Sequence, residues 1–242
     1  MEDTWKAKQD GMRSCVIRKK TMDDLHEANY IGGVDISFIK GNDRTAAAGY
    51  VIYSLNESKL VYQDVKMIEL NAPYLAGFLA FREAEPLIDL IRHQITVSAP
   101  QIRPDVIFAD GNGILHPQRC GLACHIGLAL DIPTVGVAKN LYMLPEDGIA
   151  NDESHKKKIA SMSKRGDSFL ITSNAMNGEI LGMALRTQSE ASKPIYVSIG
   201  HKIDLDTAKD LVLSASNYRV PEPIRQADIL SREFLRNNYL NG

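Results

Sequence analysis

Hydrophobic and polar positions alternate through residues 31–70 in three successive segments. The first covers residues 31–39 and ends in a Lys-Gly-Asn-Asp turn, the second covers 45–55, and the third covers 60–70. Each segment has the length and the alternation of a β-strand. Because the two connections are short, the pattern predicts an antiparallel meander of three strands.

From residue 104 onward, short apolar runs alternate with helical segments. Residues 104–110 and 132–138 indicate two buried strands on either side of a helix over 120–130, and such a unit predicts parallel strands. Strands are also expected at 178–187 and 195–200. The expected helical segments are one or two within residues 1–29, one running from Pro73 through Glu83, one from 86 to about 97, and two more at about 204–216 and 222–237.

Residues 145–167 are polar and carry the run Lys156-Lys157-Lys158, so we expect a surface helix or a mobile excursion there. The chain of 242 residues shows no repeat and no low-complexity linker, and we expect one domain over residues 1–242. Three antiparallel strands followed by alternating strands and helices predict an α/β fold. The expected architecture is a mixed sheet flanked by helices on both faces, of the ribonuclease-H-like kind.

Composition and charge narrow the functional classes. Hydrophobic residues make up 44% and charged residues 24%, as in ordinary globular proteins, and no apolar run approaches the roughly 20 residues of a membrane span. The polar N-terminal residues do not resemble a secretory signal. The net charge of −2 means that any nucleic-acid site must be a local basic patch.

The three cysteines form no CxxC pair. Their odd number favours a reducing compartment and argues against a disulfide framework. Cys120 and Cys124 lie close to His125 in the sequence, but a structural zinc needs four ligands and no partner pair is found. We therefore interpret both as core thiols.

Three acids stand where structure alone does not require them. Asp35 lies in the middle of the first strand, and the alternative is an edge-strand residue that faces solvent. Asp110 ends a buried strand before Gly-Asn-Gly, where ligands gather in open α/β sheets, and the alternative is a turn or cap aspartate. Glu83, taken alone, has the pattern of a solvated helix glutamate.

Taken together, the three acids predict one site. On the expected topology they would converge at one edge of the sheet, where carboxylates repel one another unless a cation neutralises them. Hard oxygen donors suit Mg²⁺ or Mn²⁺ rather than zinc. The chemistry that such a cluster serves is metal-assisted hydrolysis of a phosphodiester.

At these segments the sequence resembles the endonuclease V family. The matching motifs are residues 33–38, 72–83, 110–117, 121–127, 135–139 and 198–201, and the resemblance covers roughly residues 30 to 235. It implies that Asp35, Glu83 and Asp110 bind Mg²⁺, with Mn²⁺ as a substitute. It also implies that Lys139 and His201 lie near the scissile phosphate, and that Asp228 is a fourth acid. Taken alone, these last three residues would be read as surface side chains.

The resemblance further implies how a base would be held. Pro73-Tyr74-Leu75-Ala76 matches the family's wedge, which separates the target base from its neighbours; taken alone it would be a helix-entry turn with a core tyrosine. Ala76, in place of a second proline, resembles the animal form. The expected base pocket is lined by Gly77, Leu79, Gly111, His116, Gly121 and Leu122, and Gly136 lies in another matched motif. Cys120, where members usually carry an aromatic residue, and the preceding Gln118-Arg119 depart from the family.

The function implied is cleavage of the second phosphodiester on the 3′ side of inosine, leaving 3′-hydroxyl and 5′-phosphate ends. The animal-type wedge favours single-stranded RNA, with deaminated DNA as a further substrate. We expect a monomer in the cytoplasm, and also in the nucleus, without a membrane partner. The alternatives are a non-catalytic nucleic-acid-binding module on the same fold and a small-molecule phosphohydrolase.

Overall fold

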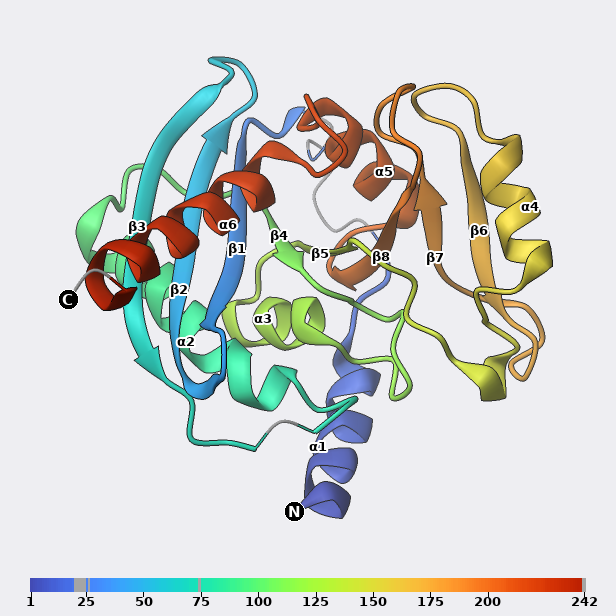
Figure 1. Ribbon diagram of the computed structural model, residues 1–242, viewed down its shortest axis with the longest axis horizontal. Helices are drawn as coiled ribbons and strands as arrows, with labels where there is room; N and C mark the ends of the chain where they lie inside the picture. The colour runs from blue at the N-terminus through green and yellow to red at the C-terminus, as the bar shows by residue number, and fades with distance from the viewer. Residues whose placement is uncertain (20–24, 26, 74, 241–242) are drawn as a thin grey trace.

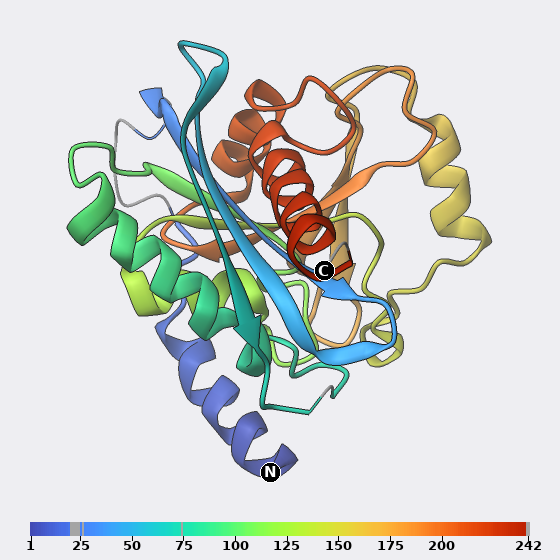
Figure 2. The same ribbon diagram turned by 60° about the vertical axis from the view of Figure 1, so that its left-hand side comes forward.

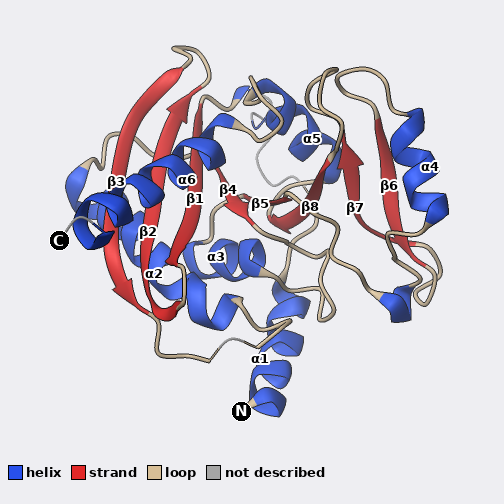
Figure 3. Ribbon diagram, viewed as in Figure 1, coloured by secondary structure: helices blue, strands red, loops and turns tan. Residues whose placement is uncertain are grey.

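One eight-stranded sheet runs through the residues that the computed structural model describes, which are 1–19, 25, 27–73 and 75–240. Its strands lie in the order β3-β2-β1-β4-β5-β8-β7-β6 (Figures 1 and 3). Their bounds are β1 Tyr30–Ile39, β2 Asn42–Ser54, β3 Lys59–Glu69, β4 Val106–Asp110, β5 Thr134–Ala138, β6 Ser168–Ser173, β7 Glu179–Leu185 and β8 Ile195–His201.

The sheet is mixed, as the sequence predicts. Strands β1, β2 and β3 form the antiparallel meander, and β4 and β5 continue the sheet in parallel with β1. This topology, with helices on both faces, confirms the ribonuclease-H-like prediction. Strand β8 then runs antiparallel to β5, and β7 and β6 each run antiparallel to their neighbour, so strand direction alternates across the C-terminal half of the sheet.

Helices cover both faces of the sheet (Figure 2). Their bounds are α1 Glu2–Cys15, α2 Ala80–His93, α3 Leu122–Leu130, α4 Glu153–Ser161, α5 Leu205–Ser214 and α6 Glu222–Leu235. Alternation along β4 divides the core, because Ile107 packs with α2 while Phe108 packs with α5 and α6 residues on the opposite face. The two faces of a single strand therefore support two hydrophobic clusters.

Helix α6 lies unusually close to β1. A Cβ atom on Gly33 would fall 2.2 Å from the backbone of Pro223, at the start of α6, so only glycine permits this approach. The close packing carries the side chains of α6 over the middle of β1, where Asp35 lies. Gly33, in the predicted strand, thus allows α6 to pack next to Asp35.

Helix α2 differs from its prediction at both ends. It begins at Ala80 rather than after Pro73, and the two expected segments form one helix that continues through Pro86 into a π-turn at Gln94–Ser98. A proline removes one helical hydrogen bond. The apolar face of α2, which includes Leu87 and Ile91, packs into the core on both sides of that position and stabilises the helix across it.

Strand β6 is missing from the predicted elements. The polar segment before it does contain a surface helix, α4, as expected, but the strand that follows lies at the free edge of the sheet. Only two of its six residues, Ile171 and Ser173, are buried, so it lacks a hydrophobic pattern. An edge strand of this kind carries a weak sequence signal because one side of it faces solvent.

Two other expectations concern cysteines and membranes. Cys120 and Cys124 are free and buried, in agreement with core thiols. None of the helices in the described part of the chain has the length and apolar character needed to span a bilayer.

Candidate active site

The site is built around Asp35, which lies on the central strand β1 and is 7% exposed. One of its carboxyl oxygens, Oδ2, accepts hydrogen bonds from Ser37 Oγ at 3.3 Å and from Ser231 Oγ at 3.1 Å. Ser37 lies two residues along the same face of the strand, and Ser231 comes from α6. Asp35 is therefore a buried, oriented carboxyl group and not a solvent-facing edge residue.

Glu83 and Asp110 approach Asp35 from two other elements. Glu83 lies in the first turn of α2 and is 7% exposed, and Asp110 is the last residue of β4. Besides burial, the charge of Asp110 and a side-chain hydrogen bond with it raise the pKa of Asp35, and the charge of Asp35 in turn raises the pKa of Glu83. The structure brings these three predicted acids together.

Lys139 supplies the positive charge of the site. It follows β5 directly, and its Nζ atom lies 2.6 Å from Asp110 Oδ2 and 3.8 Å from Asp228 Oδ1. Asp228 comes from α6 and also pairs with Arg232 at 2.7 Å, one helical turn away. Lys139 and Asp228, two surface residues by sequence alone, thus belong to the same cluster as the buried acids.

Burial and mutual repulsion disfavour ionised acids here. Burial, followed by the charges of Asp110 and Asp228, raises the pKa of Asp35 to about 7. Burial and the charge of Asp35 raise the pKa of Glu83 to about 8. Burial opposes the charged form of Lys139, but the surrounding carboxylates outweigh it and raise the pKa of the ammonium group. Acidic groups therefore outnumber the basic groups in this cluster.

This donor set fits a hard divalent cation. Within residues 1–19, 25, 27–73 and 75–240, no three acidic, histidine or cysteine side chains already stand at the spacing of ligands to one ion. Instead, Lys139 contacts Asp110, and Asp35 is held by hydrogen bonds. The raised pKa values of Asp35 and Glu83 nevertheless mark carboxylates that a cation would stabilise in the charged form.

The loop that follows β4 meets the Gly77 turn at His116. Its ring has a hydrogen bond with the backbone of Gly77, its Nδ1 accepts one from the Gln118 N–H at 3.4 Å, and it lies 5.7 Å from the ring of Tyr142. Burial lowers the pKa of His116 to about 4, which keeps the imidazole neutral at neutral pH. Gly77, with φ +85°, provides the turn that makes this contact. The expected pocket residues Gly77 and His116 are therefore adjacent.

Two of the glycines expected to line the pocket serve instead to pack one backbone segment against another. Gly121 and Gly136 are buried, and a Cβ atom on either would collide with the backbone of residues 111–113 at 2.4 Å or less. They pack the loop after Asp110 against its neighbours, and their own atoms do not line an open pocket. Gly111 and Leu122 touch each other and remain partly accessible, as does Leu79.

His201 does not lie with the acids, contrary to expectation. In the antiparallel pairing of β8 with β5, Tyr196 faces Ala138 and His201 faces Thr134. His201 is therefore five residues, about 16 Å, along the strand from the end that leads into Lys139. It is buried, and its Nδ1 accepts a hydrogen bond from the Ile17 N–H at 3.3 Å. The reversal of β8 places it at the opposite edge of the sheet.

The predicted wedge is only partly visible. Pro73 is exposed and Leu75 is half-buried, ahead of the Gly77 turn, whereas Tyr74 lies outside the described residues. The segment leads into α2, which carries Glu83. From Leu75 the chain passes through the Gly77 turn to Ala80, where α2 begins, three residues before Glu83.

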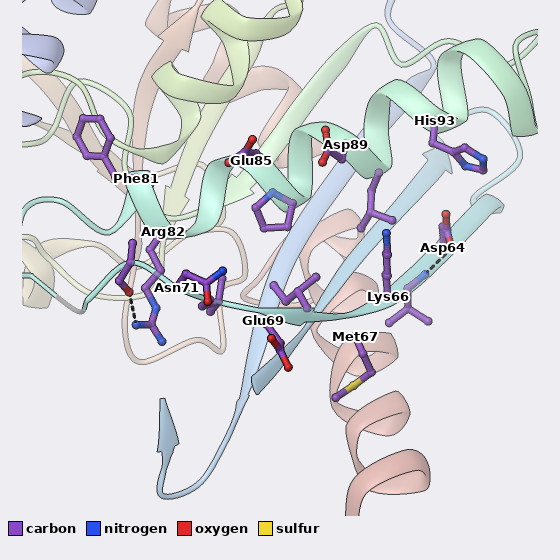
Figure 4. A pocket seen from close by; sticks show the side chains of 16 residues that line it. Asp64, Lys66, Met67, Glu69, Asn71, Phe81, Arg82, Glu85, Asp89 and His93 are labelled. Carbon is purple, nitrogen blue, oxygen red and sulfur yellow. Dashed lines mark hydrogen bonds between the residues drawn. The ribbon is translucent and has the colours of Figure 1, made fainter. Parts of the chain in front are cut away.

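A separate groove lies between β3 and α2 (Figure 4). It has a volume of about 940 Å³, and four acids line it, Asp64 and Glu69 from β3 and Glu85 and Asp89 from α2. The basic residues Lys66 and Arg82 also line the groove. The net negative lining disfavours a phosphate backbone, and the three carboxylates of the site are absent from it.

Several residues that contact the site were not predicted from the sequence. Ser37 could have been found, since it lies on the same strand face as Asp35. Ser231 and Tyr142 could not, because only the packing of α6 and of the loop after β5 brings them to the site. Arg82, whose Nη1 donates to the Ala72 carbonyl at 2.8 Å, ties the start of α2 to the wedge segment.

Clustered carboxylates and a lysine on a ribonuclease-H-like sheet define a class, the nucleases that hydrolyse phosphodiesters. Comparison with known proteins gives the family. The family model for endonuclease V matches residues 12–229. Endonuclease V of Mus musculus is 42% identical over 96% of this chain and 69% of its own length, and that of Homo sapiens is 41% identical over 97% and 83%.

Solved structures agree. The crystal structure of human endonuclease V superposes with a TM-score of 0.92 at 39% identity, covering 98% of this chain and 99% of its own. Ciona intestinalis endonuclease V, crystallised with a 24mer DNA containing an inosine followed by a ribo-adenosine, superposes with a TM-score of 0.90 at 36% identity, covering 97% and 98%. The chain belongs to the endonuclease V family and is a nuclease.

Proposed function

We propose that this protein is a magnesium-dependent endonuclease that cuts the second phosphodiester on the 3′ side of inosine in single-stranded RNA. Deaminated DNA is a second substrate, and the products carry 3′-hydroxyl and 5′-phosphate ends. The observation that carries the proposal is the convergence of Asp35, Glu83 and Asp110, with Lys139 Nζ 2.6 Å from Asp110. Family membership supports the nuclease activity.

The carboxylates of Asp35, Glu83 and Asp110 would hold the metal ion, with Mn²⁺ able to replace Mg²⁺. When bound, such an ion supplies Lewis-acid stabilisation of the phosphate and lowers the pKa of water. Ser37 and Ser231 orient the Asp35 carboxylate through their hydroxyl groups. Because neighbouring groups fix the ligands before substrate arrives, little reorganisation remains for the reaction itself.

Lys139 and Asp228 complete the proposed catalytic group. The Lys139 ammonium keeps its charge among the acids and lies where it can contact a phosphate oxygen next to the metal ligands. Asp228 Oδ1 lies 3.8 Å from the Lys139 ammonium, and Arg232 pairs with Asp228 in turn. A positioned ammonium stabilises the charge that develops on the phosphate in the transition state.

Inosine would be distinguished by its hydrogen-bonding edge. It offers a carbonyl and an N1–H where adenosine offers an amine and a bare N1, and it lacks the 2-amino group of guanosine. Backbone groups of the loops at Gly77 and Gly111 can pair with inosine and would be left unpaired by adenine. The neutral ring of His116 and the side chains of Leu79 and Leu122 form the proposed walls.

Single-stranded RNA is supported by two observations. Ala76 replaces the second proline of the bacterial wedge, which leaves a softer element suited to bases that are already unstacked. The Ciona intestinalis relative was crystallised with a 24mer DNA in which a ribo-adenosine follows the inosine. We propose that Pro73, Tyr74 and Leu75 stack beside the inosine in this strand, and that the protein acts as a monomer in the cytoplasm and nucleus.

The test compares four matched single strands, RNA and DNA, each with one inosine or one guanosine at the same position. We expect Mg²⁺-dependent cleavage of inosine RNA, slower cleavage of inosine DNA, and no cleavage of either guanosine strand. End-labelling should map the cut to the second bond and identify the termini. Cleavage without divalent metal, or equal cleavage of guanosine RNA, would contradict the proposal.

The same preparation distinguishes the two alternatives. A non-catalytic binding module would retain the inosine strand without cutting it in Mg²⁺ or Mn²⁺. A small-molecule phosphohydrolase would release phosphate from p-nitrophenyl phosphate and leave both RNAs intact. We expect neither result.

A further inference from the structure

A second, smaller pocket opens directly beside Lys139. It has a volume of about 340 Å³ and lies among the loop after β5, the start of β8 and helix α4, the helix beside β6 at the edge of the sheet away from β3 (Figure 1). Three lysines line it, Lys139, Lys156 and Lys193, together with the amide side chains of Asn140 and Asn151. One of the three, Lys139, also touches the catalytic carboxylate Asp110. The pocket therefore shares Lys139 with the proposed active site.

The pocket is positively charged. No acidic residue belongs to its lining, whereas the larger groove between β3 and α2 is lined by four acids. Lys193 is exposed and has no ion-pair partner within the described ranges, and Lys156 pairs with exposed Glu153, a contact that water and salt readily replace. Of these two hollows, only the smaller one suits a polyanion, although the whole chain has a net charge of −2.

Arg219 holds this surface in shape. Its guanidinium donates hydrogen bonds to the carbonyl oxygens of Lys139, Lys193 and Pro194, at 3.1 Å for Lys193 and 2.8 Å for Pro194. One side chain thus joins the chain segment after β5 to the segment before β8. The backbones that carry two of the three lysines are fixed relative to each other.

Helix α4 presents its three consecutive lysines differently. Lys156 lines the pocket, Lys158 lies 5.6 Å from the ring of Phe169 on another side of the helix, and Lys157 belongs to neither surface. Successive residues of a helix are about 100° apart, so one face of α4 meets the pocket and the next two lysines point elsewhere. Lys157, which belongs to the same run but lies outside the pocket, can therefore serve as a control for Lys156.

We propose that the pocket of Lys139, Lys156 and Lys193 binds the phosphate backbone of the substrate strand next to the cleavage point. This inference rests on the proposed function, because it assumes that the ligand is a nucleic-acid strand. The charge of the lining, the fixed backbones and the shared Lys139 identify the ligand as the phosphodiester backbone rather than a base. The contact is independent of sequence and adds affinity and register.

The test replaces both outlying lysines, with Lys156→Gln/Lys193→Gln as the double variant. Lys157→Gln/Lys164→Gln is the matched control, since it removes two exposed lysines that do not line the pocket. Binding is measured by fluorescence anisotropy with a labelled single-stranded RNA that carries one inosine, in EDTA, from 50 to 300 mM KCl. Cleavage of the same RNA in Mg²⁺ gives kcat and KM.

The pocket variant should bind roughly tenfold more weakly near 0.15 M salt, and the slope of log K against log salt should fall by about 1.4, since each single-strand contact contributes about 0.7. Its KM should rise with kcat within about twofold of wild type, and the control should match wild type. On a trinucleotide that spans only the cut, the pocket variant should equal wild type.

The proposal would be overturned if the two double variants bound the RNA equally well. It would also be overturned if the pocket variant lost as much activity on the trinucleotide as on the longer RNA. A wild-type protein that cuts no inosine strand would instead contradict the proposed function, which leaves the two failures distinguishable. Thermal melting of both variants excludes loss of fold as the cause of weaker binding.

Discussion

At the scale of single residues, the proposed site depends on carboxyl groups that resist ionisation. The pKa of Glu83 is raised to about 8 and that of Asp35 to about 7, mainly by burial and then by neighbouring acids. A carboxyl in the unfolded chain titrates near 4. Between these values the folded protein binds more protons than the unfolded chain, so its free energy of unfolding falls as pH rises.

We therefore expect Asp35 and Glu83 together to lower the unfolding free energy of the metal-free protein by about 1–3 kcal/mol between pH 6.5 and 8.5, measured by urea denaturation as the difference between wild type and a variant that lacks both acids. Burial lowers the pKa of His116 and of His201, so these groups act on stability below this window. Asp35→Asn/Glu83→Gln should flatten the profile and be the more stable protein at pH 8.5. A double variant as pH-dependent as wild type would show that these two acids are not the cause.

The positions of Lys139 and His201 lead to opposite expectations. Lys139→Met removes the ammonium beside Asp110 and should lower kcat on inosine RNA by about 10²–10³-fold, as loss of one preorganised donor does elsewhere. His201→Ala removes a buried acceptor for the Ile17 N–H and should cost about 1–3 kcal/mol of stability with kcat nearly unchanged. Steady-state kinetics and urea denaturation on both variants test the pair. The reverse pattern would return His201 to the site.

At the scale of elements, a buried ion-pair network fixes the loop that follows β4. Arg119, 4% exposed and with φ +55°, donates to both carboxylate oxygens of Asp147 at 2.6 and 3.0 Å and to Glu179 at 3.0 Å. It also donates to the carbonyls of His116 and Pro117. One side chain thus ties the His116 loop to the C-terminal part of the sheet.

Arg119→Met should destabilise the protein by about 3–5 kcal/mol, because it leaves the Asp147 carboxylate buried without its partner. Adding Asp147→Asn should recover part of that loss. The matched control is Lys59→Met, which breaks the exposed pair with Glu57 and should cost about 0–1 kcal/mol. Urea denaturation measures all three. Equal costs for the buried and exposed pairs would rule out the network as a support of the loop.

At the scale of the whole molecule, the central sheet was predictable and its C-terminal half only in part. The meander and the β4–α3–β5 unit carry strong apolar patterns, whereas β6 is a half-polar edge strand. The acids were predictable because Asp35 interrupts an apolar strand and Asp110 ends one. His201 was misplaced because a strand's direction depends on tertiary pairing, and its sequence is the same whether β8 runs parallel or antiparallel to β5.

The same limit explains the rest of the site. Ser231 reaches Asp35 because Gly33 and Gly49 let α6 approach the sheet, and Gly121 and Gly136 serve backbone packing rather than an open pocket. A matched motif identifies which residues gather near a site, but only the packed chain shows which of them face it.

The most direct test of the central claim is cleavage of a single-stranded RNA with one inosine, under single-turnover conditions in Mg²⁺. Asp35→Asn, Glu83→Gln and Asp110→Asn are compared with wild type, and Lys157→Gln is the surface control. Because metal ligands act as a unit, each of the three should lose at least about 10³-fold in rate while keeping the melting temperature at or above that of wild type. Near-normal cleavage by any one of them would remove that residue from the site, and near-normal cleavage by all three would contradict the account.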